Sequence, residues 1–167
     1  MVENTLTLLE NWFKEPATDN ERSKLLSKIA LIELCGWIEA EFDDLILKAQ
    51  NVVLKDEAWV RINVLNCTFG FHYAKHFRPM LTEIIGEVFV RRVENEMTSK
   101  HGAQFDGLKS SLGTLWDKRC DLAHGYMAVP GRMLTVDSPA WVKNQFLRIR
   151  KSLTLYESVI GQVVATI

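Results

Sequence analysis

Apolar residues recur at helical spacing along almost the whole chain, and no segment shows the strict alternation of a half-buried strand. The longest such pattern predicts a helix over about residues 20–50, with one continuous apolar stripe facing the core. That stripe consists of Leu25, Ile29, Ile32, Ile38, Phe42, Leu45, Ile46 and Ala49. The pattern therefore predicts an all-α fold.

Residues that cap or break helices separate the other apolar patterns. A short helix over residues 4–14 is predicted to begin at Asn4 as its cap and to stop before Pro16. Asp56 is placed to cap a further helix that carries Trp59. Each of these signals is local and needs no information about the rest of the fold.

The second half of the chain predicts three more helices. Residues from about 70 to 97 look helical, with Pro79 either kinking that helix or starting it afresh. Another helix runs over about 105–124, and a last one over about 138–164 begins at Ser138 as cap. Residues 125–137 between the last two read as a loop.

These elements predict a bundle of four long helices with short accessory helices. The chain of 167 residues contains no repeat, no low-complexity stretch and no linker rich in serine or glycine. We therefore expect residues 1–167 to form a single helical domain.

The stretch from Arg119 to Gly125 carries the candidate chemistry. Arginine is a permanent cation that binds phosphate oxygens with two prongs, and histidine transfers protons near neutral pH. Arg119 and His124 lie about 140° apart around a regular helix, so they do not share a face. They can still meet if the helix ends at His124 before Gly125, if the arginine curls around, or if the two residues belong to different subunits. Asp121 shares a face with His124 and can orient its ring.

This stretch resembles the Arg-x-x-x-x-His signature of HEPN domains, an all-helical family that includes many ribonuclease toxins and defence nucleases. It is most similar to the stand-alone bacterial proteins of the ribonuclease L-associated (RiboL-PSP-HEPN) subgroup, and residues 115–126 are its specific part. The resemblance implies a HEPN-like up-and-down bundle and a metal-independent endoribonuclease that leaves a 2′,3′-cyclic phosphate and needs no cofactor. It also implies RNA as a partner, a homodimer with a composite site, and an antitoxin or neighbouring-gene partner. Arg119, His124 and Asp121 are then the catalytic residues.

Two other interpretations stay open. Many active HEPN members carry a polar residue directly after the arginine, whereas this chain has Cys120 there. In the first interpretation the chain is a non-catalytic HEPN dimerisation module that partners a nucleotidyltransferase or another neighbouring protein. In the second it is an unrelated helical scaffold with a coincidental motif. A thiol enzyme using Cys120 and His124 is disfavoured, because no third group is evident to orient the pair.

Composition restricts where RNA can bind. Twenty basic and 21 acidic residues give a formal net charge of −1, so a global positive field is absent and any RNA site is a local patch. The candidates for that patch are Lys75, Arg78, Arg91, Arg92 and Lys118. The three cysteines form no pair, and the chain has neither a signal-peptide pattern nor an apolar run that spans a membrane. We therefore expect a cytoplasmic protein without membrane contact.

The remaining histidines suggest no metal site. His72 and His76 are four residues apart, a spacing that allows one zinc ion to bind both. A third and a fourth ligand are missing from the sequence around them, and the aromatic neighbours favour a mildly basic aromatic surface instead. His101 falls in a polar stretch that reads as loop.

Overall fold

The computed structural model describes residues 2–53, 55–124 and 137–165 of the chain. All regular elements in these residues are helical: α1 (Val2–Phe13), α2 (Asn20–Val53), α3 (Glu57–Val60), the π-helical turns η1 (Arg61–Leu65) and η2 (Tyr73–Phe77), α4 (Arg78–Ile85), α5 (Glu87–His124) and α6 (Pro139–Val164). The all-α prediction is confirmed for this part of the chain. A HEPN bundle in particular stays a prediction.

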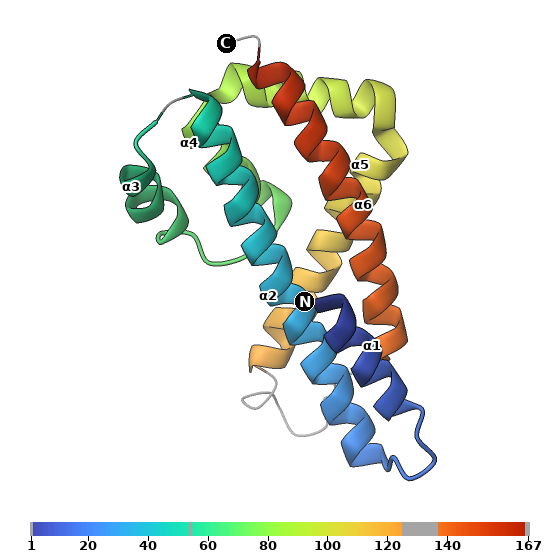
Figure 1. Ribbon diagram of the computed structural model, residues 1–167. Coiled ribbons are helices and arrows are strands. Elements are labelled where there is room, and N and C mark those ends of the chain that lie inside the picture. Colours follow the sequence, from blue (N-terminus) through green and yellow to red (C-terminus); the bar gives the residue numbers. More distant parts are fainter. Residues whose placement is uncertain (1, 54, 125–136, 166–167) are drawn as a thin grey trace.

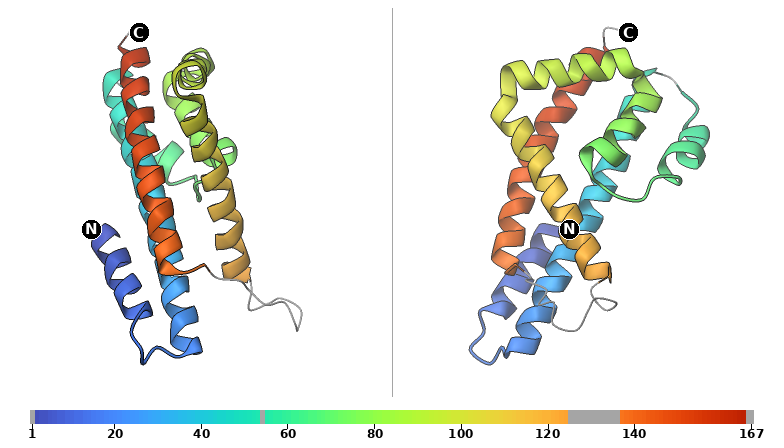
Figure 2. Two further views of the ribbon diagram at one scale, coloured as in Figure 1. Left: turned by 90° about the vertical axis from the view of Figure 1, so that its right-hand side faces the viewer. Right: turned by 180° about the vertical axis from the view of Figure 1, so that it is seen from behind.

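The last helix, α6, is central, because it packs against α1, α2 and α5. Figure 1 shows α2 and α6 running along the length of the molecule, with α1 beside the N-terminal half of α2. The two turned views in Figure 2 show that α5 bends sharply: its first half lies across the C-terminal end of α6, and its second half runs back along the bundle. Short helices α3 and η1 lie to one side, outside α2 and α4.

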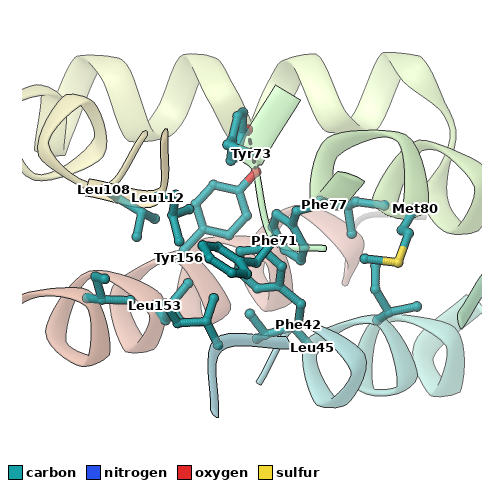
Figure 3. Packing of buried hydrophobic residues seen from close by; sticks show 14 of the residues in the cluster. Phe42, Leu45, Phe71, Tyr73, Phe77, Met80, Leu108, Leu112, Leu153 and Tyr156 are labelled. Carbon is teal, nitrogen blue, oxygen red and sulfur yellow. Dashed lines mark hydrogen bonds between the residues drawn. The ribbon is translucent and has the colours of Figure 1, made fainter. Parts of the chain in front are cut away.

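Aromatic side chains from three segments meet in the middle of the core (Figure 3). Phe42 of α2 stacks on Phe77 with ring centroids 4.2 Å apart, and Tyr156 of α6 lies 5.6 Å from Phe77. The hydroxyls of Tyr73 and Tyr156 are 2.9 Å apart, and Tyr73 also donates to Glu94 at 3.0 Å. Burial raises the pKa of both phenols. The two tyrosines are therefore neutral and their hydroxyls are satisfied inside the core.

The predicted helix over residues 70–97 is divided into three pieces. Pro79 lies in the first turn of α4, which follows directly on the π-helical turn η2. Gly86 ends α4 with a φ of +84°, and α5 starts at the next residue, Glu87. That backbone conformation is accessible to glycine because it has no Cβ. The prediction allowed a new start only at Pro79 and did not read Gly86 as a helix end, so it missed the boundary between α4 and α5.

A loop was predicted around His101, and the structure interrupts the helix at that residue with a kink, while the residues on both sides of it are helical. The two halves of α5 join at a kink at which His101 has φ −141° and ψ 32°. Met97 before the kink and Phe105 after it are both buried. The break is therefore confined to a single non-helical residue between two helices that are both packed into the core.

The apolar stripe of α2 is confirmed only in its C-terminal half. Ile38, Phe42 and Ile46 are buried there, as expected. In the N-terminal half Leu25 and Ile32 are 57% and 60% exposed. The buried stripe in that half consists instead of Leu26, Ala30, Leu31, Leu34 and Cys35. Two adjacent apolar faces were present in the sequence, and only packing decides which of them turns inward.

Local cap signals agree with the structure at two of three positions. The Asp56 carboxylate accepts the Trp59 N–H at 2.8 Å, and the Ser138 hydroxyl accepts the Trp141 N–H at 3.3 Å. Asn4 is not a cap, since α1 already begins at Val2. Across the residues that the structure describes, none of the helices combines the length and the apolar character that crossing a membrane requires.

Candidate functional site

Arg119 lies on the outer part of α5 and is held by groups from three segments. Its guanidinium carbon is 5.5 Å from the ring centroid of Trp116, one turn earlier on α5, and 6.0 Å from that of Phe71. Its Nη2 is 3.2 Å from Oε1 of Glu39 on α2. The side chain is 39% exposed. Two aromatic rings and one carboxylate therefore fix the guanidinium while one side of it stays open to solvent.

The contact between Glu39 and Arg119 is an ion pair without an aligned hydrogen bond. Oε1 of Glu39 is buried and accepts no hydrogen bond within the described structure, although Nη2 of Arg119 is close. A guanidinium has five N–H donors in a planar fork, and this contact occupies the edge of one nitrogen. Arg119 therefore has donors left for a second anion.

His76 packs on Trp116, one of the two aromatic residues beside Arg119. Its ring centroid lies 4.6 Å from that of Trp116, and its Nδ1 accepts the backbone N–H of His72 at 3.0 Å. Burial, followed by the charges of His72, Lys75 and Arg119, lowers the pKa of His76 below its usual value. The imidazole is therefore neutral at physiological pH.

Gly70 makes this close packing possible. It has a φ of +135°, and a Cβ added to it would lie 2.7 Å from both Cη2 of Trp116 and Cε1 of His76, and would overlap Cζ3 of Trp116. No larger residue fits at this distance. The extended segment before η2 therefore lies directly against the tryptophan and the histidine.

The suggested zinc pair takes a different role. His72 caps η2: its Nδ1 accepts the Lys75 N–H at 3.4 Å, while its backbone N–H goes to His76. Both Nδ1 atoms are thus engaged by backbone donors. Among the described residues no group of three or more His, Cys, Asp or Glu side chains is arranged to hold a metal ion.

The helix geometry of the motif agrees with the sequence argument. α5 is helical through His124, so the backbones of Arg119 and His124 project about 140° apart. The side chain of His124 and residues 125–136, which include Gly125 and the predicted loop, lie outside the described residues. Asp121 is exposed on the same helix. Their catalytic roles stay predictions.

A cavity of about 370 Å³ opens beside Arg119, between α2 and the end of α5. Its lining is mostly apolar and consists of Lys28, Leu31, Ile32, Cys35, Arg119, Leu122 and Ala123. Burial raises the pKa of the Cys35 thiol to about 12, so this thiol is not a nucleophile near neutral pH. Arg119 and Lys28 are the polar groups that a ligand in this cavity would meet.

The five residues predicted to bind RNA divide into two groups. Arg78, Arg91 and Lys118 are each paired with carboxylates: Arg78 with Glu87 and Glu94, Arg91 with Glu87, and Lys118 with Asp137. Lys75 and Arg92 have no carboxylate partner among the described residues, and Lys75 lies next to His76. Only these two are available to phosphate without breaking an ion pair.

Other basic residues without carboxylate partners in the described part were not singled out by the sequence. Arg148 and Lys151 line a groove of about 310 Å³ between α5 and α6, together with Ser111 and Ser152. Lys28 lines the cavity beside Arg119. Pairing decides which cations are free, and it depends on contacts between distant segments.

Sequence reasoning missed the residues that position Arg119. Trp116 precedes Arg119 by three residues and therefore shares its helix face, a signal that was available. Gly70 between two phenylalanines also indicates a close backbone approach. Glu39 gives no such signal, because it is one of many acidic residues on α2.

Comparison of the chain with protein-family models, with curated proteins and with solved structures found no match.

Proposed function

We propose that this protein is a metal-independent endoribonuclease of the HEPN type. The ribose 2′-hydroxyl attacks the adjacent phosphorus and the bond to the 5′-oxygen breaks, leaving a 2′,3′-cyclic phosphate and a 5′-hydroxyl. The observation that carries the proposal is the placement of Arg119. An arginine fixed by aromatic rings, partly exposed and with free donors beside a cavity, is suited to bind a phosphate and the charge that develops on it.

The other roles follow from the Arg-x-x-x-x-His pattern. His124 acts as general base or general acid in the transfer, and Asp121 orients its ring. Basic residues outside the motif hold the strand, with Lys75 and Arg92 the ones free of carboxylate partners in the described structure. Because Arg119 and His124 project about 140° apart on one helix, each site draws on two subunits.

Exposed apolar residues next to the motif support the homodimer. Ile32 is 60% exposed and lines the cavity beside Arg119, and Leu25 is exposed two turns earlier on α2. Leu122 and Ala123 continue the same surface onto α5. Packing two copies through this surface covers these side chains and brings both motifs to one groove.

The ribonuclease proposal is tested by RNA cleavage in EDTA with wild-type protein and three variants. His124→Ala is expected to lower the rate by about 10²–10⁴-fold, the usual contribution of a general acid or base. Arg119→Lys is also expected to fail, because an ammonium does not reproduce the planar two-pronged grip. Arg61→Lys is the matched control, since Arg61 is exposed on η1 and is ion-paired to Glu57.

Products carrying a 2′,3′-cyclic phosphate, identified by mass, and a dimer by light scattering at micromolar concentration are the expected results. Cleavage that persists unchanged in His124→Ala contradicts the mechanism. Nuclease activity that is lost in EDTA and restored by a divalent metal contradicts the mechanism as well.

A non-catalytic HEPN module that partners a nucleotidyltransferase or another neighbouring protein is the second candidate. The contact between Arg119 and Glu39 favours this candidate, because the carboxylate already neutralises part of the positive charge that would attract a phosphate. A dimer that cleaves no RNA, with or without metal, supports this candidate over the first.

A further inference from the structure

The ring of His76 is fixed on three sides. It packs on Trp116 with ring centroids 4.6 Å apart and the ring planes inclined at 56°, and its Nδ1 accepts the His72 N–H at 3.0 Å. Its Cε1 lies so close to Gly70 that a Cβ there would be 2.7 Å away. The ring therefore has one orientation, and the nitrogen that remains is Nε2.

The hydrogen bond to Nδ1 decides the tautomer. A backbone N–H can only donate, so Nδ1 of His76 offers its lone pair and carries no proton. In a neutral imidazole the proton then lies on Nε2, which becomes a donor. Nε2 makes no hydrogen bond within the described residues. The buried side-chain polar atoms that lack a partner there are Oε1 of Glu39 and Oε1 of Gln50, so Nε2 is not among them. It is therefore an N–H group open to a ligand.

Arg119 approaches the same tryptophan. Its guanidinium carbon is 5.5 Å from the Trp116 centroid, and its charge is one of those that act on His76. We infer that the Nε2–H of His76 and the guanidinium of Arg119 form one oxyanion-binding site within a single subunit, which holds the oxygens of a phosphate group. This inference rests on the proposed function only in naming an RNA phosphodiester as the natural source of that phosphate.

A neutral donor is the suitable partner for an arginine here. A second cation beside Arg119 would be repelled by it and by Lys75, whereas an N–H dipole adds a hydrogen bond to an anion without that penalty. Because its lone pair is already used on Nδ1, His76 does not act as a general base. Its role is to bind the phosphate and thereby to complement the proton transfer assigned to His124.

Glu39 does not exclude the anion. Its Oε1 contacts Nη2 of Arg119 without an aligned hydrogen bond, so the other N–H groups of the guanidinium remain available. The carboxylate and a bound anion can therefore contact different N–H groups of the same guanidinium.

The first test is nitrogen NMR on the wild-type protein at neutral pH. His76 is expected to show the Nε2–H tautomer, and its Nε2 signal is expected to move on titration with inorganic phosphate. A cationic ring or an Nδ1–H tautomer overturns the inference, as does a signal that phosphate leaves unchanged.

The second test compares two variants in binding a 2′-deoxy oligonucleotide, which has phosphodiesters but no 2′-hydroxyl and so is not cleaved. His76→Phe keeps a ring against Trp116 but removes the donor, and is expected to bind about tenfold to a hundredfold more weakly. His76→Gln keeps an N–H donor and is expected to stay within about threefold of wild type. His101→Gln, at the kink of α5, is the control for loss of a histidine elsewhere.

Equal binding by His76→Phe and wild type overturns the inference, and so does an equal loss in His76→Phe and His76→Gln. Inorganic phosphate is titrated in parallel to separate a free phosphate ion from the backbone of a strand. Binding that follows these expectations in a protein without nuclease activity upholds the oxyanion site and rejects the proposed function. Cleavage by a protein whose His76→Phe variant binds normally does the reverse.

Discussion

Replacing Gly70 with alanine probes the packing that holds Trp116, His76 and, through them, Arg119. Gly70 has a φ of +135°, a region that side chains with a Cβ rarely adopt. The new methyl group would lie 2.7 Å from both Cη2 of Trp116 and Cε1 of His76, which is closer than carbon atoms pack. The substitution therefore acts on the backbone and on the two rings at once.

The magnitude combines these two effects. Forcing a residue with a Cβ into a sparsely populated backbone region costs about 1–3 kcal/mol, and overpacking a filled site costs about another 1–3 kcal/mol. Trp116 has little room to yield, because Phe71 packs edge-on against it at 5.6 Å. We expect Gly70→Ala to lose about 2–6 kcal/mol of unfolding free energy, which lowers Tm by about 4–24 °C in a domain of this size.

Thermal unfolding followed by circular dichroism measures the loss, and Gly161→Ala is the matched control. Gly161 lies in α6, and a Cβ added to it meets no atom within 4 Å. Alanine is the better helix former by up to about 1 kcal/mol, so this control is expected to raise Tm by about 2–4 °C. A Gly70→Ala protein that melts within a degree of wild type would falsify the claim that Gly70 is required for the contact. A parallel fall in both variants would show that the effect is not specific to this packing.

Three further changes test the network behind the site. Arg78→Gln is expected to cost about 1–2 kcal/mol of unfolding free energy, measured in urea, because its guanidinium is 28% exposed and contacts two carboxylates. Arg91 is exposed and has a single ion pair, so Arg91→Gln is expected to cost about 0.3–0.5 kcal/mol. Equal losses in the two variants would contradict this. Tyr73→Phe is expected to cost more unfolding free energy than Tyr156→Phe, roughly 1–3 against 0.5–1.5 kcal/mol, because the Tyr73 hydroxyl bonds both Glu94 and the Tyr156 hydroxyl. The reverse order in the same assay would contradict this prediction. The pKa of His76 is lowered in the folded protein, so below about pH 6.5 the unfolded chain binds more protons and the stability of the fold is expected to fall as the pH is lowered. Thermal melts of wild type and His76→Phe at pH 7.5 and 5.5 measure this effect. A variant with the same pH dependence as wild type contradicts it.

The sequence by itself determined the features that depend on neighbouring residues. Helical periodicity predicted an all-α chain, and Asp56 and Ser138 were identified as caps because a cap side chain bonds a backbone N–H three residues away. The 140° separation of Arg119 and His124 was also predictable, since a continuous helix fixes the angle between any two of its positions. The apolar pattern gave the C-terminal half of α2 correctly for the same reason.

Only the tertiary structure decided which alternatives those local rules leave open. Leu25 and Ile32 face solvent because the neighbouring stripe packs inward, and the break at His101 is a kink between two helices whose residues on both sides are buried. The surroundings of Arg119 come from α2, from the segment around Gly70 and from α5, which are far apart in the chain. Contacts of this kind depend on side-chain volumes and charges meeting across the fold, and a pattern read along the chain contains no information on which distant partner is present. For that reason the motif was visible in the sequence, whereas its contacts with Trp116 and Glu39 and the packing of Gly70 and His76 around them were not.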